Sequence, residues 1–268
     1  MQVYRCLDIG TAKPSREEQQ RVRHHLIDVA ELNESFDAAR FVELAKAAVT
    51  DIQSRAKVPI FCGGTGLYFK GYLDGLGEAP ASDPLLRSQL ESTPLDQLLQ
   101  ELQKTDPVTY ERIDRQNPRR IVRALEVIRL TGKPFSQQRS AWKTSSHPNA
   151  FGITRPSSEL IDRIHQRVDE MFRRGLVAET EALLKQGLEQ NRTAMQAIGY
   201  KQVVEHLRGE RSLPETIELV KIRTRQFAKR QMTWFRRQAS MTWINLGASE
   251  KEETVVEKLA AAYRIAPG

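Results

Sequence analysis

The sequence holds only two cysteines among its 268 residues. Cys6 and Cys62 lie far apart, and neither belongs to a Cys-x-x-Cys pair or to a His–Cys spacing. Disulfide scaffolds and zinc sites are built from several closely spaced ligands, so neither class is indicated. Because disulfides mark oxidising compartments, we expect this protein in the cytoplasm.

Long apolar runs are also lacking. No stretch approaches the roughly 20 apolar residues that cross a bilayer, and the first residues lack the charged-then-apolar order of a signal peptide. Hydrophobic residues make up 40% of the chain and charged residues 28%, which is typical of a globular protein with one large or two modest domains. We therefore expect no membrane partner, and we expect a monomer.

Two common catalytic patterns are absent. No G-x-x-x-x-G-K-S/T phosphate loop occurs in the printed sequence, although the stretch DIGTAKPS contains a Gly-Thr-x-Lys. None of the five histidines belongs to an H-E-x-x-H motif or to an evident triad with serine or cysteine. The sequence therefore offers no metal-ligating residue that we can assign.

Acidic residues are fewer than basic ones, 34 against 41, so the net charge is +7. An excess of positive charge favours polyanionic partners, above all nucleic acid, if the charge is clustered. The string KIRTRQFAKRQMTWFRR has seven basic residues in seventeen and no acidic one. At helical spacing its apolar stripe faces a core, so most of the basic side chains lie on other faces, where an RNA or DNA backbone is the fitting partner.

A second basic group occurs in NPRRIVRALEV, where Arg119, Arg120 and Arg123 lie within about one helical turn. Two of them share a face. A solvated helix face explains this pattern as well as a nucleic-acid contact does, so both interpretations stay open.

The most suggestive turn is GGTG, Gly63 to Gly66, which follows the strand-like run Val58–Cys62 and precedes a helix. Glycines let a ligand approach the backbone, and the free N–H groups and dipole of a helix N-terminus attract phosphate. Thr65 adds a hydroxyl donor. Alternatively the motif is a structural turn with Thr65 as the helix N-cap.

The hydrophobic pattern predicts an α/β protein, because helices alternate with short buried strands in both terminal parts of the chain. Between Asp83 and about Thr131 nearly everything is expected to be helical, with prolines near apparent helix starts. We expect strands at 1–4, 24–29, 58–62, 150–156 and 241–247, and further helices at 15–23, 36–57, from 65, 157–187, 196–208, 213–238 and 250–264.

Six strings, in this order, resemble the tRNA dimethylallyltransferase family, whose members prenylate N6 of the adenosine 3′ to the anticodon: DIGTAKPS, HHLIDV, PIFCGGTGLYFKGYLDGL, RRIVRALEVIRLTGK, QAIGYKQ and RTRQFAKRQMTWFR. The resemblance covers essentially the whole chain. It implies a P-loop-NTPase-like parallel sheet core, residues 1–82 and 150–268, and an all-helical tRNA-binding insertion, residues 83–149.

The resemblance also implies roles for individual residues. Thr65 matches the family threonine that hydrogen-bonds the bridging oxygen of the leaving pyrophosphate, and is the expected catalytic residue. The diphosphate is expected to bind Gly63, Gly64, Gly66 and Arg225. The expected tRNA contacts are Tyr4, Arg87, Arg119, Arg120, Arg123, Gln196, Gly199, Tyr200, Lys201, Lys229 and Arg230. Some family members have arginine where this chain has the uncharged Gln196, so whether Gln196 replaces that contact stays open.

The expected substrates are dimethylallyl diphosphate and a tRNA anticodon stem-loop, and the expected cofactor is Mg²⁺, which neutralises the diphosphate. The target adenine must leave the anticodon stack to reach the allylic carbon. The single-stranded loop supplies the specificity, because its base edges are readable.

In the family a strand, a P-loop and an Asp-Ser pair precede the residues that match MQVY. The resemblance therefore implies that this chain is N-terminally truncated and weakly active or inactive, either by a real deletion or through a misassigned start codon. Two further alternatives are a non-catalytic RNA-binding remnant and an adenylate prenyltransferase that uses free nucleotide. The basic insertion and the RRIVRALEV string argue against the last.

Overall fold

The computed structural model describes residues 1–77, 79–138, 146–247, 250 and 252–263. The chain divides into two compact units, Met1–Phe69 with Thr144–Gly268, and Lys70–Lys143. We call them the α/β unit and the helical unit, and each is described by itself. The helical unit begins earlier than the insertion expected at 83–149, and residues 139–145, near the expected end, lie outside the described residues.

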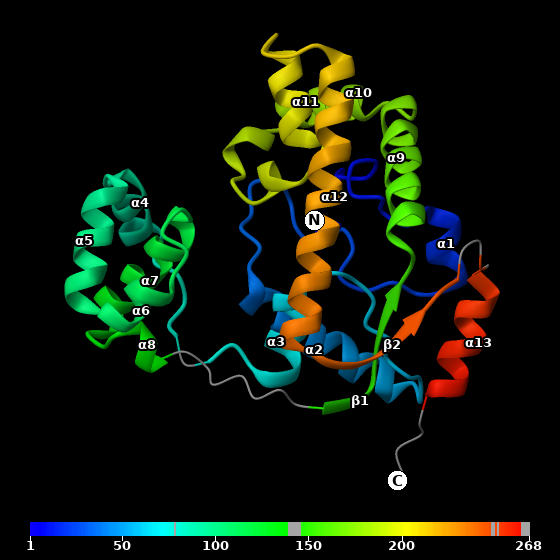
Figure 1. The fold of residues 1–268 in the computed structure, drawn as a ribbon, viewed down its shortest axis with the longest axis horizontal. Helices are drawn as coiled ribbons and strands as arrows, with labels where there is room; N and C mark the ends of the chain where they lie inside the picture. Colours follow the sequence, from blue (N-terminus) through cyan, green and yellow to red (C-terminus); the bar gives the residue numbers. More distant parts are fainter. Residues whose placement is uncertain (78, 139–145, 248–249, 251, 264–268) are drawn as a thin grey trace. The chain divides into compact units, whose positions relative to one another are not determined.

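The α/β unit is rich in helices and contains a small sheet (Figure 1). Helix α3 (Gly66–Asp74) begins in this unit and crosses into the helical unit. The other elements are α1 (Arg16–Arg21), α2 (Ala38–Ser54), β1 (Ser146–Thr154), α9 (Ser157–Arg173), α10 (Leu176–Lys185), the 3₁₀ turns η1 (Leu188–Gln190) and η2 (Ala194–Gln196), α11 (Tyr200–Leu207), α12 (Leu213–Gln238), β2 (Ser240–Asn245) and α13 (Glu252–Ala262).

Strands β1 and β2 pair in parallel, with Phe151 opposite Thr242 and Thr154 opposite Asn245. Parallel strands need a long crossover, and here helices α9 to α12 supply it. The strands predicted at 150–156 and 241–247 are thus confirmed, with β1 starting earlier. The predicted α/β class is confirmed in this form: mostly helix, with a small parallel sheet.

Three other predicted strands are wrong. The segments 1–4 and 24–29 meet only in one parallel bridge, between Tyr4 and Ala30. Leu26 and Asp28 have positive φ, 61° and 54°, which a strand does not allow. Among the described residues the segment 58–62 has no sheet partner, and Ile60 is 86% exposed. Its β-branched residues favour an extended chain, but only a neighbouring strand makes a sheet.

The main core of the α/β unit joins the N-terminal segment to helices α10 and α11. Its fully buried side chains are Tyr4, Leu7, Leu176, Leu188, Ala194, Tyr200 and Val203. A smaller cluster holds α9 against α12 through Ile164, Val168 and Val220. The first cluster holds the N-terminal segment against α10 and α11, and the second holds α12 against α9.

Helix α12 begins with a capping box, because Ser212 accepts from the backbone of Glu215 and Glu215 bonds back to Ser212. Proline lies in its first turn, where the missing N–H costs nothing. Its bounds are those predicted from the sequence, 213–238.

The helical unit contains α4 (Pro84–Ser92), α5 (Leu95–Thr105), α6 (Pro107–Arg112), α7 (Pro118–Thr131) and α8 (Phe135–Gln138). Asp83, Asp106 and Asn117 cap three of these helices, and each is followed by proline. The central helix α7 buries Ile121 and Leu125 against Leu90, Leu98 and Leu102. The helical prediction for this part of the chain is confirmed.

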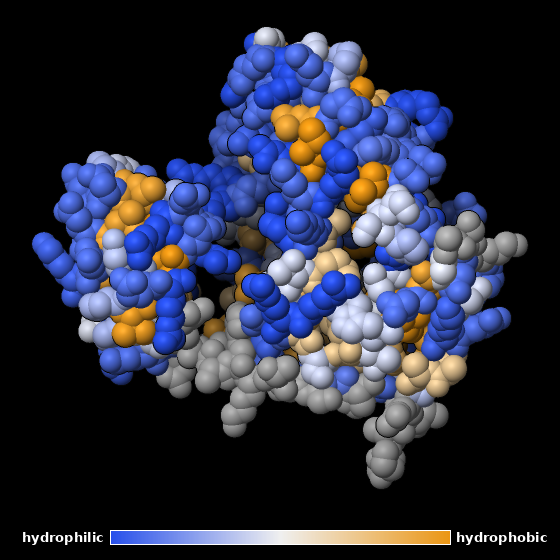
Figure 2. Space-filling view, viewed as in Figure 1, coloured by the Kyte–Doolittle hydropathy of each residue, from blue (hydrophilic) through white to orange (hydrophobic). Residues whose placement is uncertain are grey.

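The surface visible in Figure 2 is largely hydrophilic, with smaller hydrophobic patches among the helices. Among the described residues, no helix has the length and apolar character needed to span a membrane.

Candidate functional site

The GGTG loop ends where α3 begins. The Thr65 carbonyl accepts backbone hydrogen bonds from Tyr68 at 2.9 Å and Phe69 at 3.4 Å, so Thr65 occupies the N-cap position. Thr65 is exposed, and the contacts of the described residues include no hydrogen bond of its hydroxyl. Because the Tyr68 and Phe69 N–H groups already donate to Thr65, the N–H groups of Gly66 and Leu67 are the first-turn donors that lack a partner among the described contacts. This end of α3 therefore presents a hydroxyl and backbone donors together, as an anion requires.

Helix α12 packs directly on this loop. Gln231 Nε2 donates to the Gly64 carbonyl at 2.9 Å. A Cβ on Gly64 would overlap the Gln231 amide, and one on Gly66 would overlap the Trp234 ring, whereas one on Gly63 would meet only Phe69 at 3.9 Å. Gly64 and Gly66 are therefore required by packing, which supports the structural interpretation for these two glycines. The same packing brings the basic helix to the loop.

The basic residues of α12 differ in their surroundings. Lys221 is neutralised, because its Nζ lies 2.8 Å from Asp169 and 2.9 Å from Glu218. The Arg230 guanidinium lies 5.9 Å from the Phe227 ring centroid. Arg225 is half-buried and Lys229 is exposed, and the contacts among the described residues pair neither with an acid. Arg225, Lys229 and Arg230 thus keep their charge available for an anionic ligand.

In the QAIGYK segment the two ends are the most exposed positions. Gln196 and Lys201 are exposed, whereas Gly199 and Tyr200 are buried. Gly199 has a φ of 103°, a conformation that favours glycine. Direct tRNA contact by Gly199 and Tyr200 therefore does not fit this structure, while Gln196 and Lys201 remain candidates.

Tyr200 has an internal role instead. Its hydroxyl donates to Glu179 at 2.5 Å and accepts from the Gly10 backbone N–H at 3.1 Å. Burial first, and the hydrogen bond to Glu179 second, raise the pKa of the Tyr200 hydroxyl. A Cβ on Gly10 would overlap the Tyr200 ring, so the backbone at Gly10 packs directly against the first residue of α11.

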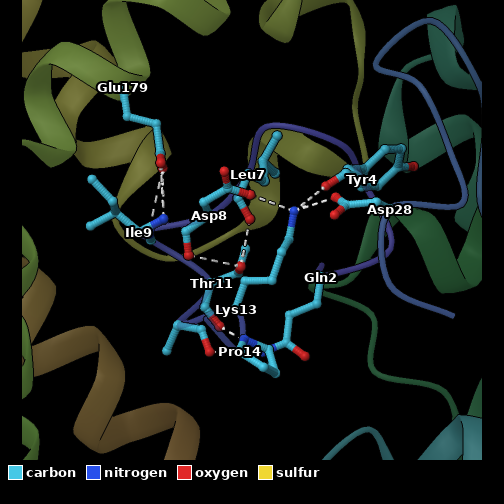
Figure 3. A network of polar contacts seen from close by, with 12 residues as sticks. Gln2, Tyr4, Leu7, Asp8, Ile9, Thr11, Lys13, Pro14, Asp28 and Glu179 are labelled. Atoms are coloured by element: carbon cyan, nitrogen blue, oxygen red, sulfur yellow. Dashed lines mark hydrogen bonds and ion pairs between the residues drawn. The ribbon is translucent and has the colours of Figure 1, made fainter. Parts of the chain in front are cut away.

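Figure 3 shows the polar network around residues 8–13. The Glu179 carboxylate accepts the Ile9 backbone N–H at 2.9 and 3.1 Å. The Lys13 ammonium donates to Asp8 and Asp28, both at 2.5 Å, and to the Tyr4 carbonyl at 3.0 Å. The Lys13 side chain is only 5% exposed, so this cation is satisfied internally. Residues 8–13 are therefore held at Ile9 and Gly10 by Glu179 and Tyr200, and at Lys13 by Asp8, Asp28 and Tyr4.

Tyr4 is placed differently from its prediction. It is fully buried, and its ring packs edge-on against Phe36 with centroids 6.5 Å apart. A side chain inside the core cannot touch tRNA in this conformation. Tyr4 thus lies in the core of this structure, and its contact with tRNA stays a prediction.

In the helical unit two of the predicted arginines converge on one carboxylate. Arg87 Nη2 and Arg123 Nη1 donate to the same oxygen of Glu126, at 2.7 and 2.6 Å. Their side chains remain 37% and 31% exposed. Desolvation first, and the charge of Arg87 second, lower the pKa of the exposed Arg119. Arg120 is also exposed, and no described contact joins its side chain to this group.

Sequence reasoning missed Lys13, Glu126 and Glu179, whereas Gln231 and Trp234 belong to the stripe of the basic helix that was expected to face a core. Glu126 carried a signal, because it is an acid inside the apolar face of RRIVRALEV. Glu179 carried none, since its partners at Ile9 and Gly10 lie about 170 residues away in the sequence.

The expected Mg²⁺ has no preformed protein cage among the described residues. Across the described residues, no three side chains of histidine, cysteine, aspartate or glutamate gather closely enough to hold a metal ion. Mg²⁺ is commonly held by one or two protein ligands together with substrate phosphates and water, so Mg²⁺ stays a prediction.

Comparison with known proteins gives a consistent result. tRNA dimethylallyltransferase 1 of Trichlorobacter lovleyi is 44% identical, over 97% of this chain and 87% of that protein. The tRNA dimethylallyltransferase of Acetivibrio thermocellus is 41% identical, over 97% of this chain and 85% of its own length.

Two solved structures are similar over 97% of this chain. The full-length tRNA isopentenylpyrophosphate transferase of Bacillus halodurans is 37% identical, with 84% of its chain covered and a TM-score of 0.68. A eukaryotic dimethylallyltransferase acting on tRNA is 27% identical, with 69% of its chain covered and a TM-score of 0.73.

These relatives lend no support to the two alternatives, an RNA-binding remnant and an adenylate prenyltransferase. The family model for IPP transferase matches residues 2–238, which is well over half of the sequence. This chain, a helix-rich α/β protein with an exposed threonine at the start of α3, belongs to the IPP transferase family.

Proposed function

We propose that this chain transfers a dimethylallyl group from dimethylallyl diphosphate to N6 of the adenosine 3′ to the anticodon, position 37, of tRNA. The family match and the printed names of the relatives support a dimethylallyl donor and a tRNA acceptor. The position of the target base follows from the resemblance of the six sequence strings.

The observation that carries the proposal is the packing of α12 on the GGTG loop. The Thr65 hydroxyl and the first-turn donors of α3 provide the diphosphate with hydrogen bonds, and α12 provides positive charge. Arg230 immediately precedes Gln231, the residue bonded to the loop, and Arg225 lies six residues before Gln231, about 9 Å along the helix axis. Arg225 and Arg230 lie on the helix that packs on the loop, so α12 is the proposed source of positive charge for the diphosphate.

The reaction is a substitution at the allylic carbon. The N6 lone pair forms a bond to C1 of the dimethylallyl group, the C1–O bond breaks, and diphosphate leaves with that electron pair. The alkylated N6 amine then gives up a proton to solvent water. Negative charge grows on the bridging oxygen as the bond breaks, and a hydrogen bond from Thr65 to that oxygen strengthens in the transition state.

The tRNA side of the proposal uses exposed cations and amides. Lys201 and Gln196 in the α/β unit, and Arg87, Arg119, Arg120 and Arg123 in the helical unit, offer donors for phosphates. We propose that residues 83–149 form the tRNA-binding insertion and that the α/β unit is a P-loop-NTPase-like core. Mg²⁺ stays a prediction.

The test is a transfer assay with radiolabelled dimethylallyl diphosphate. Acceptors are an anticodon stem-loop with adenosine at position 37, the same stem-loop with guanosine there, and AMP. Label on the first acceptor alone, above the background of Thr65→Ala, supports the proposal. Label on AMP but not on RNA, or none on any acceptor, contradicts it.

A further inference from the structure

Glu126 is a carboxylate inside the core of the helical unit. It is 0% exposed and lies between Leu125 and Val127, which are also fully buried. Desolvation by itself would raise its pKa, but hydrogen bonds from Arg123, Ser82 and Arg87 outweigh that effect and lower the pKa. Glu126 is therefore ionised at neutral pH, and neighbouring groups must compensate its buried negative charge.

Those neighbours come from two helices and the segment before them. One oxygen, Oε1, accepts the Ser82 hydroxyl at 2.8 Å and the Asp83 backbone N–H at 3.2 Å. The other, Oε2, accepts Arg87 from α4 and Arg123 from α7. Arg123 also donates to the Pro80 carbonyl at 2.6 Å. Both carboxylate oxygens thus accept two hydrogen bonds each, so the orientation of the carboxylate is fixed.

Because Arg87 and Arg123 donate to the same carboxylate oxygen, their guanidinium groups lie close together. Without Glu126 their like charges would repel each other. Each guanidinium carries five N–H donors, and the described contacts use one on Arg87 and two on Arg123. About a third of each side chain is exposed. Arg119 lies one helical turn before Arg123 on α7.

We propose that Glu126 is a positioning residue that holds Arg87 and Arg123 together as one binding site for an RNA phosphate. A paired, forked donor set fits a phosphate better than two separately moving side chains do. The inference rests on the proposed function, since it takes tRNA as the substrate. It adds a residue that does not touch the RNA and acts through the two that do.

The sign of the effect separates this role from simple electrostatics. If Glu126 were a bystander, removing its negative charge would tighten RNA binding, by up to about twofold at a distance near 10 Å. If Glu126 positions the arginines, neutralising it weakens RNA binding despite the gain in net positive charge. A purely structural role predicts unfolding without a change in the affinity of the folded protein.

The experiment uses the full chain and an unmodified tRNA transcript, with binding followed by fluorescence anisotropy over a range of salt. The test variant is Glu126→Gln. The matched control is Glu101→Gln, because Glu101 forms a comparable two-bond pair with Arg129 of the same helix α7, at 2.9 and 2.6 Å. Circular dichroism and thermal melting define the temperature at which every variant is folded.

We expect Glu126→Gln to raise the Kd for tRNA about tenfold, while Glu101→Gln leaves it within about twofold. The slope of log Kd against log salt should fall by about one, because one RNA phosphate is no longer neutralised. Equal or tighter binding by folded Glu126→Gln would overturn the inference.

A second series does not depend on the folding of Glu126→Gln. Arg87→Gln, Arg123→Gln and the double variant form a cycle. One shared site predicts that the double variant loses little more affinity than either single variant. Fully multiplicative losses would overturn the inference. A wild-type chain that binds no tRNA would instead contradict the proposed function, so the two failures are distinguishable.

Discussion

Thr65 is the residue on which the proposed chemistry depends most. Its hydroxyl is exposed at the N-cap of α3, and its backbone carbonyl already starts the helix. Replacing Thr65 by alanine should lower kcat about 100-fold, because the leaving oxygen then lacks a hydrogen-bond donor in the transition state. Single-turnover transfer to the stem-loop measures this effect.

The control for Thr65 is Thr105→Ala, which removes an exposed hydroxyl bonded to the Glu101 carbonyl at the end of α5. It should leave transfer unchanged. Thr65→Ser should keep most of the rate, because the hydroxyl remains. A Thr65→Ala chain that transfers label as fast as the wild type would remove Thr65 from the mechanism.

Tyr200 and Lys201 are neighbours in sequence with opposite expected roles. Tyr200→Phe leaves Glu179 and the Gly10 N–H without their hydroxyl partner, so it should reduce the free energy of unfolding by about 1–3 kcal/mol. Lys201→Ala should leave stability unchanged and weaken tRNA binding. Urea unfolding and tRNA titration of the two variants separate the roles. The reverse pattern would restore Tyr200 as an RNA contact.

At the scale of elements, α12 contacts the GGTG loop through Gln231 and Trp234. Gly66→Ala places a methyl group in the Trp234 ring, so it should cost roughly 1–3 kcal/mol of stability through overpacking. Gly63→Ala is the matched variant, since its methyl group meets only Phe69 at 3.9 Å. Comparable melting temperatures for both variants would show that α12 does not rest on the loop as described.

The helical unit should be sensitive to acid. The pKa of Asp106 is lowered from its usual 3.8: burial opposes this, but hydrogen bonds from Thr109 and Ser136 outweigh it. The pKa of Glu126 is lowered in the same sense. Folded-state values below the unfolded ones mean that this stabilisation is complete above the usual carboxyl pKa and is lost as pH falls through the folded values.

Thermal unfolding at pH 7 and at about pH 3 measures the acid effect. Asp106→Asn should shrink the difference in Tm between the two pH values, because the titrating group is gone. Asp96→Asn is the control at an exposed position. An unchanged difference in Asp106→Asn would contradict the assignment.

Helices were predictable where their ends carry chemical signals. Ser212 and Glu215 form the capping box that starts α12, and Asp83, Asp106 and Asn117 before prolines mark α4, α6 and α7. Strands were less predictable, because a strand forms only beside a second strand, and the residues of the first do not indicate where that second strand lies. The apolar run at 58–62 is extended and exposed, and Leu26 and Asp28 break the run at 24–29 with positive φ.

At the scale of the whole molecule, the sequence predicted the family through six strings, and the comparisons confirm the family. The individual contacts were only partly predictable. Tyr4, Gly199 and Tyr200 matched the family's motifs but are buried, since burial depends on neighbours far away in the sequence. The pairing of Arg87 and Arg123 through Glu126 likewise joins two helices, with Arg87 and Glu126 39 residues apart.

The most direct test of the account is the identity of the modified nucleoside. A tRNA transcript with adenosine at position 37 is incubated with this chain and dimethylallyl diphosphate, digested to nucleosides and measured by mass spectrometry. The account predicts adenosine carrying one dimethylallyl group on N6, from position 37, above the level made by Thr65→Ala. Product at another position or on free AMP, or an equal yield from Thr65→Ala, would contradict it.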